Sequence, residues 1–216
     1  MNIQKLKHFI NRPEYIFRPW QVYHRFFKRN SNSVNKFQEV VLPWGLTIKI
    51  PTSTDDTLPK SILIYGIYDL SLTEVIWRLL ESGENAIDIG ANIGYVTSLM
   101  SAKVGKTGKV WCFEPNPEIY EELTINIANW EIKGYSNIHH QQIALSNYSG
   151  YGVLNLTPKN RGEVFIDKNQ QVANVQTNSR DACVVPIDRL DKFLEKEQNC
   201  IGVLKIDVEG HELDVL

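Results

Sequence analysis

The chain has 216 residues, of which 43% are hydrophobic and 22% charged, which excludes a disordered or fibrous protein and suits one globular domain with an extension. Its three cysteines are odd in number and lack CxxC spacing, so neither a zinc knuckle nor a disulfide framework is indicated. The net charge of -2 is uneven, because residues 1–36 carry eight Lys/Arg against Glu14, hence +7, which leaves -9 for the remainder.

Residues 1–36 form a basic head in which aromatic side chains are interspersed with Lys and Arg. Such a composition is able to touch an anionic membrane surface or nucleic acid. Pro13 and Pro19 interrupt any long helix, and we favour simple packing of the aromatics onto the domain that follows. We therefore expect no nucleic-acid partner and at most weak membrane-surface contact. The polar stretch at residues 30–36 is the linker candidate.

Signals for membrane insertion or export are weak. No apolar run approaches the roughly 18 residues that cross a bilayer. The first residues, MNIQKLKHFI, lack the hydrophobic region of a signal peptide. We expect a cytoplasmic protein.

Residues 37–83 are expected to form a lead-in element ahead of the main domain. Its first part alternates apolar with polar residues, which predicts a half-exposed strand or hairpin with apolar positions at Leu46, Ile48 and Ile50. A helix should follow from Ser71, because Ser71 and Glu74 have the spacing of a capping box, and Gly83 offers its end. The expected buried stripe of this helix consists of Val75, Ile76, Leu79 and Leu80.

Residues 84–216 contain two clear strand–turn–helix units. The first strand ends in DIGANIG, residues 88–94, and a helix follows up to Gly105. The second strand closes on Glu114, and Pro117 then stands where a first helical turn tolerates proline. The expected buried stripes are Val96, Leu99, Met100 and Val104 in the first helix, and Ile119, Leu123, Ile127 and Trp130 in the second.

The second half of this domain carries weaker signals. Residues 137–144 predict a third strand, the turn-rich segments up to residue 185 predict an inserted hairpin, and residues 188–194 predict a short helix. A fourth strand ends at Asp207, before the first turn of another helix. This alternation predicts an α/β fold, with a Rossmann-like parallel sheet, helices on both faces and right-handed crossovers.

The residues directly after each strand are the candidates for chemistry, because ligands of open α/β sheets bind beyond the carboxyl ends of the strands. After the first strand, Gly90 and Gly94 stand four apart, unlike the glycines in the GxGxxG motif of nicotinamide-binding folds. We expect Gly90 to let a ligand approach the backbone, and Gly94 to let the helix pack close to the strand. A tight turn alone could require both glycines for structural reasons.

Glu114 ends the second strand about 20 residues beyond the glycine turn, where an acidic residue can accept hydrogen bonds from both ribose hydroxyls of an adenosine ligand. The alternative for Glu114 is a solvated strand end or a cap for the helix that begins near Pro117. Taken together, the glycine turn and Glu114 favour an adenosine ligand.

The segment after the fourth strand gathers three carboxylates and an imidazole. Asp207, Glu209 or His211 could take a proton from an attacking hydroxyl. In the structural alternative, Glu209 and Glu212 favour a helix N-terminus electrostatically, and His211 is an exposed residue of the first turn. The sequence does not choose among these roles.

A pair of histidines, His139 and His140, is adjacent in a predicted strand. The two side chains should point to opposite faces of that strand, so they cannot both chelate one metal. We assign the pair no function and expect no metal ligands elsewhere.

These motifs occur in the order seen in FkbM-type methyltransferases, which the chain resembles through DIGANIG, the strand-end FEP, IALSN before a turn, and KIDVEGHELDVL. The lead-in from WGLTIKI to GIYDLSLTE is also similar to the upstream part of that family, so the resemblance covers roughly residues 40–216. It implies a seven-stranded class I methyltransferase fold, with S-adenosylmethionine as donor and, most often, a hydroxyl as acceptor.

Carried over by position, the resemblance places the methionine part of the donor at residues 88–94, the ribose at Glu114 and the adenine edge at Ala144. Asp207 and Glu209 would border the methyl group and the acceptor. The candidate cofactor-binding residues are Asp88, Gly90, Ala91, Asn92, Gly94, Glu114, Asn116 and Ala144. The candidate catalytic residues are Asp207, Glu209 and His211.

The chain departs from the family pattern at its end, because the family fold continues with another helix and three more strands, whereas this sequence stops at Leu216. We therefore expect a fragment, a truncated gene product or a chain completed by a partner, with an open strand edge that favours self-association. The expected function is O-methylation of a hydroxyl on a sugar, lipid-linked or secondary-metabolite acceptor. The alternatives are a non-catalytic cofactor-binding or partner-completed protein and, disfavoured by the glycine spacing, a nicotinamide-dependent oxidoreductase.

Overall fold

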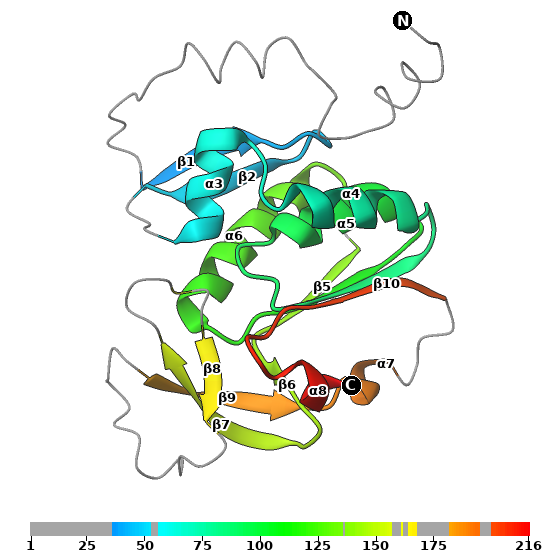
Figure 1. Cartoon of the computed structure of the whole chain (residues 1–216). Coiled ribbons are helices and arrows are strands. Elements are labelled where there is room, and N and C mark those ends of the chain that lie inside the picture. The colour runs from blue at the N-terminus through cyan, green and yellow to red at the C-terminus, as the bar shows by residue number, and fades with distance from the viewer. Residues whose placement is uncertain are drawn as a thin grey trace, which may run out of the picture.

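A computed structural model describes residues 36–52, 56–135, 137–156, 161, 164–167, 182–194 and 200–216. Its centre is a sheet of four parallel strands in the order β10-β3-β4-β5 (Figure 1). The strands are β3 (Asn85–Ile89), β4 (Val110–Phe113), β5 (Ile138–Gln141) and β10 (Ile201–Ile206). The predicted parallel α/β sheet is confirmed. The predicted basic head and linker lie outside the described residues, except for Lys36.

The central sheet is covered on both faces, which is why every residue of β3 is buried. One face packs its Ala86 and Val110 against three helices, and the other packs Ile87, Ile89 and Phe113 against two short helices. The three are α4 (Leu70–Leu79), α5 (Tyr95–Val104) and α6 (Pro117–Ile132), and the two are α7 (Asp191–Leu194) and α8 (Glu212–Val215). The prediction of helices on both faces is therefore confirmed.

The helices α5 and α6 follow the sequence pattern closely. Gly94 is the N-cap of α5 and Gly105 its C-cap, while Pro117 opens α6. The predicted apolar stripes are all buried, namely Val96, Leu99, Met100, Val104, Ile119, Leu123, Ile127 and Trp130. Glycine, proline and helical periodicity thus agree with the tertiary packing of this part of the chain.

The lead-in begins with an antiparallel hairpin and one helix, which precede α4. They are β1 (Phe37–Val41), β2 (Thr47–Pro51) and α3 (Thr57–Tyr65), of which the sequence pattern did not predict the helix. The predicted apolar positions of the hairpin are all buried, namely Leu46, Ile48 and Ile50. The hairpin packs on α6, where the Trp130 indole N–H donates to the Thr47 carbonyl at 2.7 Å. The predicted hairpin is confirmed.

The start and the end of α4 differ from the prediction. The N-cap is Asp69, whose carboxylate accepts the Leu72 N–H at 2.9 Å, so Ser71 lies inside the first turn. Asp caps a helix as well as Ser does, and Asp69 comes first in the chain. The helix also ends at Leu79, because Leu80 is already extended, and therefore stops before Gly83.

The buried stripe of α4 is the predicted one only in part, because Ile76 and Leu80 are buried as predicted. Thr73, Ile76 and Leu80 are buried, whereas Val75 and Leu79 are 50% and 63% exposed. The buried residues follow i, i+3, i+7 spacing and form one line along the helix. The Thr73 hydroxyl in this line lies 3.0 Å from the Tyr95 hydroxyl of α5. Because α4 packs on α5 through Thr73, Ile76 and Leu80, the apolar side chains of Val75 and Leu79 are left exposed.

A second sheet of four strands lies beside the first, with the order β6-β9-β7-β8. Its strands are β6 (Ala144–Leu145), β7 (Gly150–Leu156), β8 (Val164–Asp167) and β9 (Ala182–Asp188). β7 pairs antiparallel with both β8 and β9, which confirms the inserted hairpin. The strand predicted at residues 137–144 is split, because β5 belongs to the first sheet and β6 to the second. The predicted helix at residues 188–194 starts later, since Asp188 still belongs to β9.

Two structural features bear on the expected partners, namely the edge of the parallel sheet and the length and polarity of the helices. Within the part of the chain that the structure describes, β10 is an outer strand of the parallel sheet, and its pairing with another chain stays a prediction. None of the described helices combines the length and apolar character that spanning a membrane requires.

The Asn126 side chain joins the lead-in hairpin to the main domain, and its removal should be costly. It is fully buried, accepts the Lys49 N–H at 2.7 Å and donates to the carbonyls of Lys49 at 3.2 Å and Ile93 at 3.0 Å. Asn126→Ala leaves these backbone groups without a partner, so the free energy of unfolding should fall by about 3 kcal/mol in urea titrations. Asn129→Ala is the control, because Asn129 makes one long bond of 3.4 Å to Thr47. Equal losses in the two variants would contradict the joining role of Asn126.

Candidate functional site

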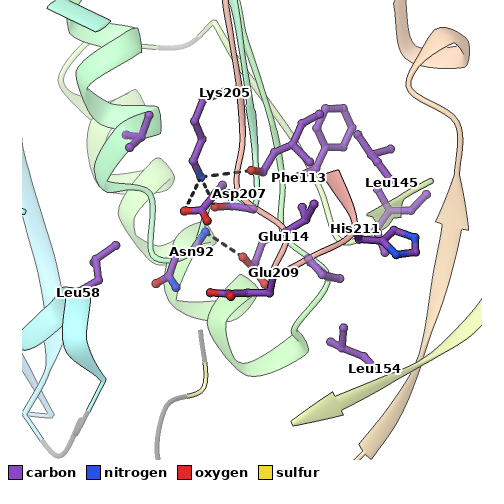
Figure 2. Close-up of a pocket in the computed structure, with 18 of the residues that line it drawn as sticks. Leu58, Asn92, Phe113, Glu114, Leu145, Leu154, Lys205, Asp207, Glu209 and His211 are labelled. Atoms are coloured by element: carbon purple, nitrogen blue, oxygen red, sulfur yellow. Dashed lines mark hydrogen bonds and ion pairs between the residues drawn. The ribbon is translucent and has the colours of Figure 1, made fainter. Parts of the chain in front are cut away.

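A pocket of about 200 Å³ opens beyond the carboxyl ends of β3, β4 and β10 (Figure 2). This volume is more than ten times the roughly 10–15 Å³ that one water molecule requires on the same measure, and it suits an organic ligand. The lining includes eight of the predicted site residues, namely Gly90, Ala91, Asn92, Glu114, Ala144, Asp207, Glu209 and His211. Asp88, Gly94 and Asn116 are not part of the lining. The topology therefore gathers most of the predicted residues, which lie far apart in the sequence.

The turn after β3 requires glycine at position 90 for a packing reason that the sequence did not predict, while the predicted approach of a ligand to this backbone stays a prediction. Gly90 has φ +75, and a Cβ here would lie 2.0 Å from the Asp207 carbonyl oxygen. The close approach is thus made by the end of β10, and the absent side chain lets the two loops meet. The turn is also fixed to β4, because the N–H groups of Gly90 and Ala91 both donate to the Phe113 carbonyl.

Gly94 serves a packing role outside the pocket. It has φ +93, and a Cβ at this position would lie 2.7 Å from Leu123 Cδ1 and 2.8 Å from Trp130 Cη2. The predicted close packing therefore exists, but its partner is α6 and not the strand. The expectation that Gly94 brings α5 close to the strand was wrong in this respect.

Glu114 is a buried carboxylate in the pocket wall. Its Oε2 accepts the Asn92 N–H and its Oε1 accepts the Asn116 N–H, both at 2.9 Å. Burial raises the pKa of Glu114 to about 7, although these two hydrogen bonds and the positive charge of Lys205 act in the opposite direction. Glu114 is not the N-cap residue of α6, because the Asn116 side chain caps the helix by accepting the Glu118 N–H, but Glu114 does accept the N–H of Asn116. Each Glu114 oxygen keeps a lone pair for a ligand.

Lys205 is a buried residue of the site to which the sequence reasoning gave no role. Its ammonium donates to the Gly90 carbonyl at 2.7 Å and to the Ile89 carbonyl at 3.2 Å, and lies 3.1 Å from Asp88 Oδ1. Asp88 is fully buried behind the lining and also accepts the Thr97 hydroxyl at 2.6 Å. A Lys inside an apolar strand is rarely buried without a partner, and this was the available signal in the sequence.

The three candidate catalytic residues occupy different environments. Asp207 is 65% exposed at the end of β10, and its Oδ2 lies 3.6 Å from Lys205 Nζ. Glu209 is exposed and has a left-handed backbone with φ 47. His211 is buried, with Nε2 3.1 Å from the Ser146 hydroxyl and Nδ1 3.4 Å from Asp214 Oδ2. The expectation of an exposed His211 is therefore wrong, since both ring nitrogens face protein groups.

The lead-in contributes a wall of the pocket that the sequence did not predict, formed by Thr57, Leu58, Tyr68 and Leu72. Arg161 fixes the start of this wall, because its guanidinium donates to Asp56 at 2.7 and 2.9 Å and to Glu122 of α6 at 2.7 Å. No sequence spacing signals these contacts, which join residues more than a hundred positions apart in one case.

His139 and His140 lie away from the pocket on opposite faces of β5, as predicted. The His139 ring stacks on Trp111, and His140 Nδ1 lies 2.7 Å from the Tyr120 hydroxyl. Among the described residues, no group of three or more His, Cys, Asp or Glu side chains is arranged to hold a metal ion.

Comparison with known proteins places the chain in a family. The model of the methyltransferase FkbM domain matches residues 88–216. The chain belongs to this family. The match starts within β3 and includes the glycine turn, Glu114 and the loop after β10, so the resemblance inferred from the motifs is confirmed.

The similar proteins match the chain at low identity and over only part of their own length. Methyltransferase 1 of Beauveria bassiana is 29% identical over 143 residues, which are 60% of this chain and 56% of that protein. Hexuronic acid methyltransferase AglP of Haloferax volcanii is 29% identical over 160 residues, 71% of this chain and 59% of that protein. The solved methyltransferase FkbM of Methylobacillus flagellatus is 14% identical with a TM-score of 0.41, over 68% of this chain and 36% of that one. The chain thus spans less than two thirds of the length of each.

The raised pKa of Glu114 should appear as a pH dependence of stability. The unfolded chain releases this proton near the ordinary value of 4.5 and the folded protein releases it near 7, so the folded state binds more protons in between. Stability must then fall as pH rises through this window, by up to about 3 kcal/mol for this residue. Urea unfolding of Glu114→Gln between pH 5 and 8 should lack this contribution. The exposed Glu121→Gln variant should keep the full slope, and an unchanged slope in Glu114→Gln would refute the assignment.

Proposed function

We propose that the chain binds S-adenosylmethionine in this pocket and transfers its methyl group to a hydroxyl on a sugar, lipid-linked or secondary-metabolite acceptor. The observation that carries the proposal is the buried Glu114 carboxylate, which lines the pocket beside the glycine turn and accepts only one backbone N–H at each oxygen among the described residues.

The chemistry of the lining fits the donor. The two Glu114 oxygens suit the neighbouring hydroxyls of a ribose, and Gly90 and Asn92 line the pocket beside them. Apolar residues suit an adenine ring, namely Phe113, Ile143, Ala144, Leu145 and Leu154. The lining contains the carboxylates of Glu114, Asp207 and Glu209 and one ammonium, that of Lys205. Its electrostatic field therefore favours a cationic ligand. When bound, S-adenosylmethionine supplies an electrophilic methyl group on a positively charged sulfur.

Asp207 is the residue to which we assign the general-base role. The Lys205 ammonium lies closer to Gly90, Ile89 and Asp88 than to Asp207, which is 3.6 Å away, so the exposed Asp207 carboxylate has lone pairs for an acceptor hydroxyl. His211 is less suited, because Ser146 and Asp214 engage its two nitrogens. The acceptor proton would pass to Asp207 as the hydroxyl oxygen attacks.

The sugar acceptor has support from one relative, which is named a hexuronic acid methyltransferase. The exposed carboxylates of Asp207 and Glu209 at the pocket also suit a ligand with several hydroxyl groups, since ionised carboxylates only accept hydrogen bonds.

The donor-binding role of Glu114 can be measured without an acceptor. Glu114→Gln removes charge-assisted hydrogen bonds of about 1.5–3 kcal/mol, so S-adenosylmethionine should bind about 10- to 100-fold more weakly in calorimetry. Affinity of the parent protein should rise from pH 6 to pH 8, because the ionised carboxylate accepts hydroxyl protons better and its pKa is about 7. Glu121→Gln should leave both results unchanged. Equal affinity in Glu114→Gln would remove the basis of the proposal.

The base role of Asp207 separates turnover from binding. Asp207→Asn keeps the shape of the side chain and removes its basicity, so turnover should fall about 100-fold or more while donor affinity changes less than about twofold. Transfer of labelled methyl from S-adenosylmethionine to methyl glycosides measures the first quantity, and calorimetry measures the second. Asp191→Asn, on the exposed face of α7, is the control. Normal turnover of Asp207→Asn would exclude Asp207 as the base.

A further inference from the structure

Tyr68 lines the pocket from the segment between α3 and α4. This segment precedes the residues that match the family domain, which begin at Asp88. One wall of the pocket is thus built by a part of the chain outside that match. A residue in this position can set which acceptor is bound without being part of the donor-binding motifs.

The position of Tyr68 is held by its neighbours. Its ring packs edge-on against Tyr95 at 6.2 Å between ring centroids, and its carbonyl accepts the Thr73 hydroxyl at 3.1 Å. Tyr95 is fixed in turn by an edge contact with Trp44 at 5.2 Å. The aromatic rings therefore link the hairpin to the pocket, and Tyr68 is a rigid part of its wall.

Within the described part of the chain, no hydrogen bond joins the Tyr68 hydroxyl to another protein group. Tyr95 shares a hydrogen bond with Thr73, and Tyr120 shares one with His140, whereas no described group donates to or accepts from the Tyr68 hydroxyl. A half-buried phenol usually finds a hydrogen-bond partner. A ligand in the pocket would supply one.

The surroundings of Tyr68 keep its hydroxyl protonated. Burial and the negative charges of Asp207, Asp69 and Glu209 raise its pKa, against the opposing effect of Lys205. Tyr68, Asp207 and Glu209 all line the same pocket. The phenol there is a hydrogen-bond donor beside two carboxylate acceptors.

Backbone strain is concentrated around the same space. Among the described residues, the non-glycine positions with positive φ are Asp69 at 38, Asn92 at 52 and Glu209 at 47. Asn92 and Glu209 line the pocket, and Asp69 directly follows Tyr68 and caps α4. Such conformations cost free energy and cluster at binding sites.

We propose that Tyr68 is the acceptor-orienting residue and that the acceptor is a neutral cyclic polyol such as a pyranose, an inference that rests on the proposed methyl transfer. The C–H face of such a ring packs on the phenol, one ring hydroxyl accepts the Tyr68 proton, and neighbouring hydroxyls donate to Asp207 and Glu209. A uronic acid is disfavoured, because its carboxylate would meet these two negative charges.

The first experiment separates donor binding from the role of Tyr68. Calorimetry with S-adenosylhomocysteine compares the parent protein with Tyr68→Phe and Tyr68→Leu, and with Tyr65→Phe and Tyr65→Leu as controls. Tyr65 is 58% exposed on α3 and is not part of the lining. All five proteins should bind with the same Kd within about twofold. Failure of the parent protein to bind would defeat the proposed function itself. A selective loss in the Tyr68 variants would place Tyr68 in the donor site and overturn the acceptor role.

The second experiment measures the acceptor directly. Saturation-transfer NMR with S-adenosylhomocysteine present should detect binding of methyl β-D-glucopyranoside to the parent protein. The affinity for this glucoside should be about fivefold weaker in Tyr68→Phe, at least tenfold weaker in Tyr68→Leu, and unchanged in the Tyr65 variants. Methyl β-D-glucuronide should bind at least about fivefold more weakly than the glucoside. In the methyl-transfer assay, Tyr68→Phe should raise KM for the glucoside more than it lowers kcat. Absent glucoside binding, equal binding by Tyr68→Leu, or tighter binding of the glucuronide would overturn the proposal.

A spectroscopic titration distinguishes contact from packing. The ultraviolet difference between the parent protein and Tyr68→Phe isolates ionisation of the Tyr68 phenol. Addition of the glucoside to the protein with S-adenosylhomocysteine should shift this ionisation to higher pH, because a hydrogen-bonded proton leaves less readily. An unchanged titration under saturating glucoside would show that the acceptor does not contact Tyr68.

Discussion

The Lys205 ammonium is the interaction on which the site depends. It is buried between β3 and β10, compensates the buried charge of Asp88 and bonds the carbonyls of Ile89 and Gly90. A buried charge is tolerated only when its partner and hydrogen bonds are in place, so the two strand ends must meet in one arrangement. The missing Cβ at Gly90 makes room for the same meeting. The Lys205–Asp88 ion pair and the missing Cβ of Gly90 therefore favour one arrangement of the loops after β3 and β10, which line the pocket.

Backbone hydrogen bonds connect the ends of β3 and β10 to the end of β4. The amides of the glycine turn bond the Phe113 carbonyl, and the amide of Asn92 bonds Glu114. The ends of β10, β3 and β4 thus form one connected network of hydrogen bonds. A pocket framed in this way is ordered before a ligand arrives, which lowers the entropic cost of binding.

The sequence predicted the features that are local. Glycine and proline positions and the helical periodicity identified β3, α5, β4 and α6, because each of these signals acts within a few residues. The cap of α4 was misplaced because Asp69 and Ser71 are equivalent candidates until packing chooses. Lys205 and Tyr68 gained no role from the sequence, since their significance arises from contacts across the fold. Asp88, Gly94 and Asn116 were predicted to bind the ligand; they are not part of the pocket lining, and their contact with a ligand stays a prediction.

The origin of the Tyr68 wall in the lead-in has an evolutionary consequence. Residues 57–72 precede the part of the chain that matches the FkbM domain, and four of them line the pocket. Substitution, insertion or recombination in this stretch can change the shape of one wall while the strand ends and their hydrogen bonds stay intact. Descendants of one ancestral domain can in this way diversify their chemistry by exchanging a short upstream module.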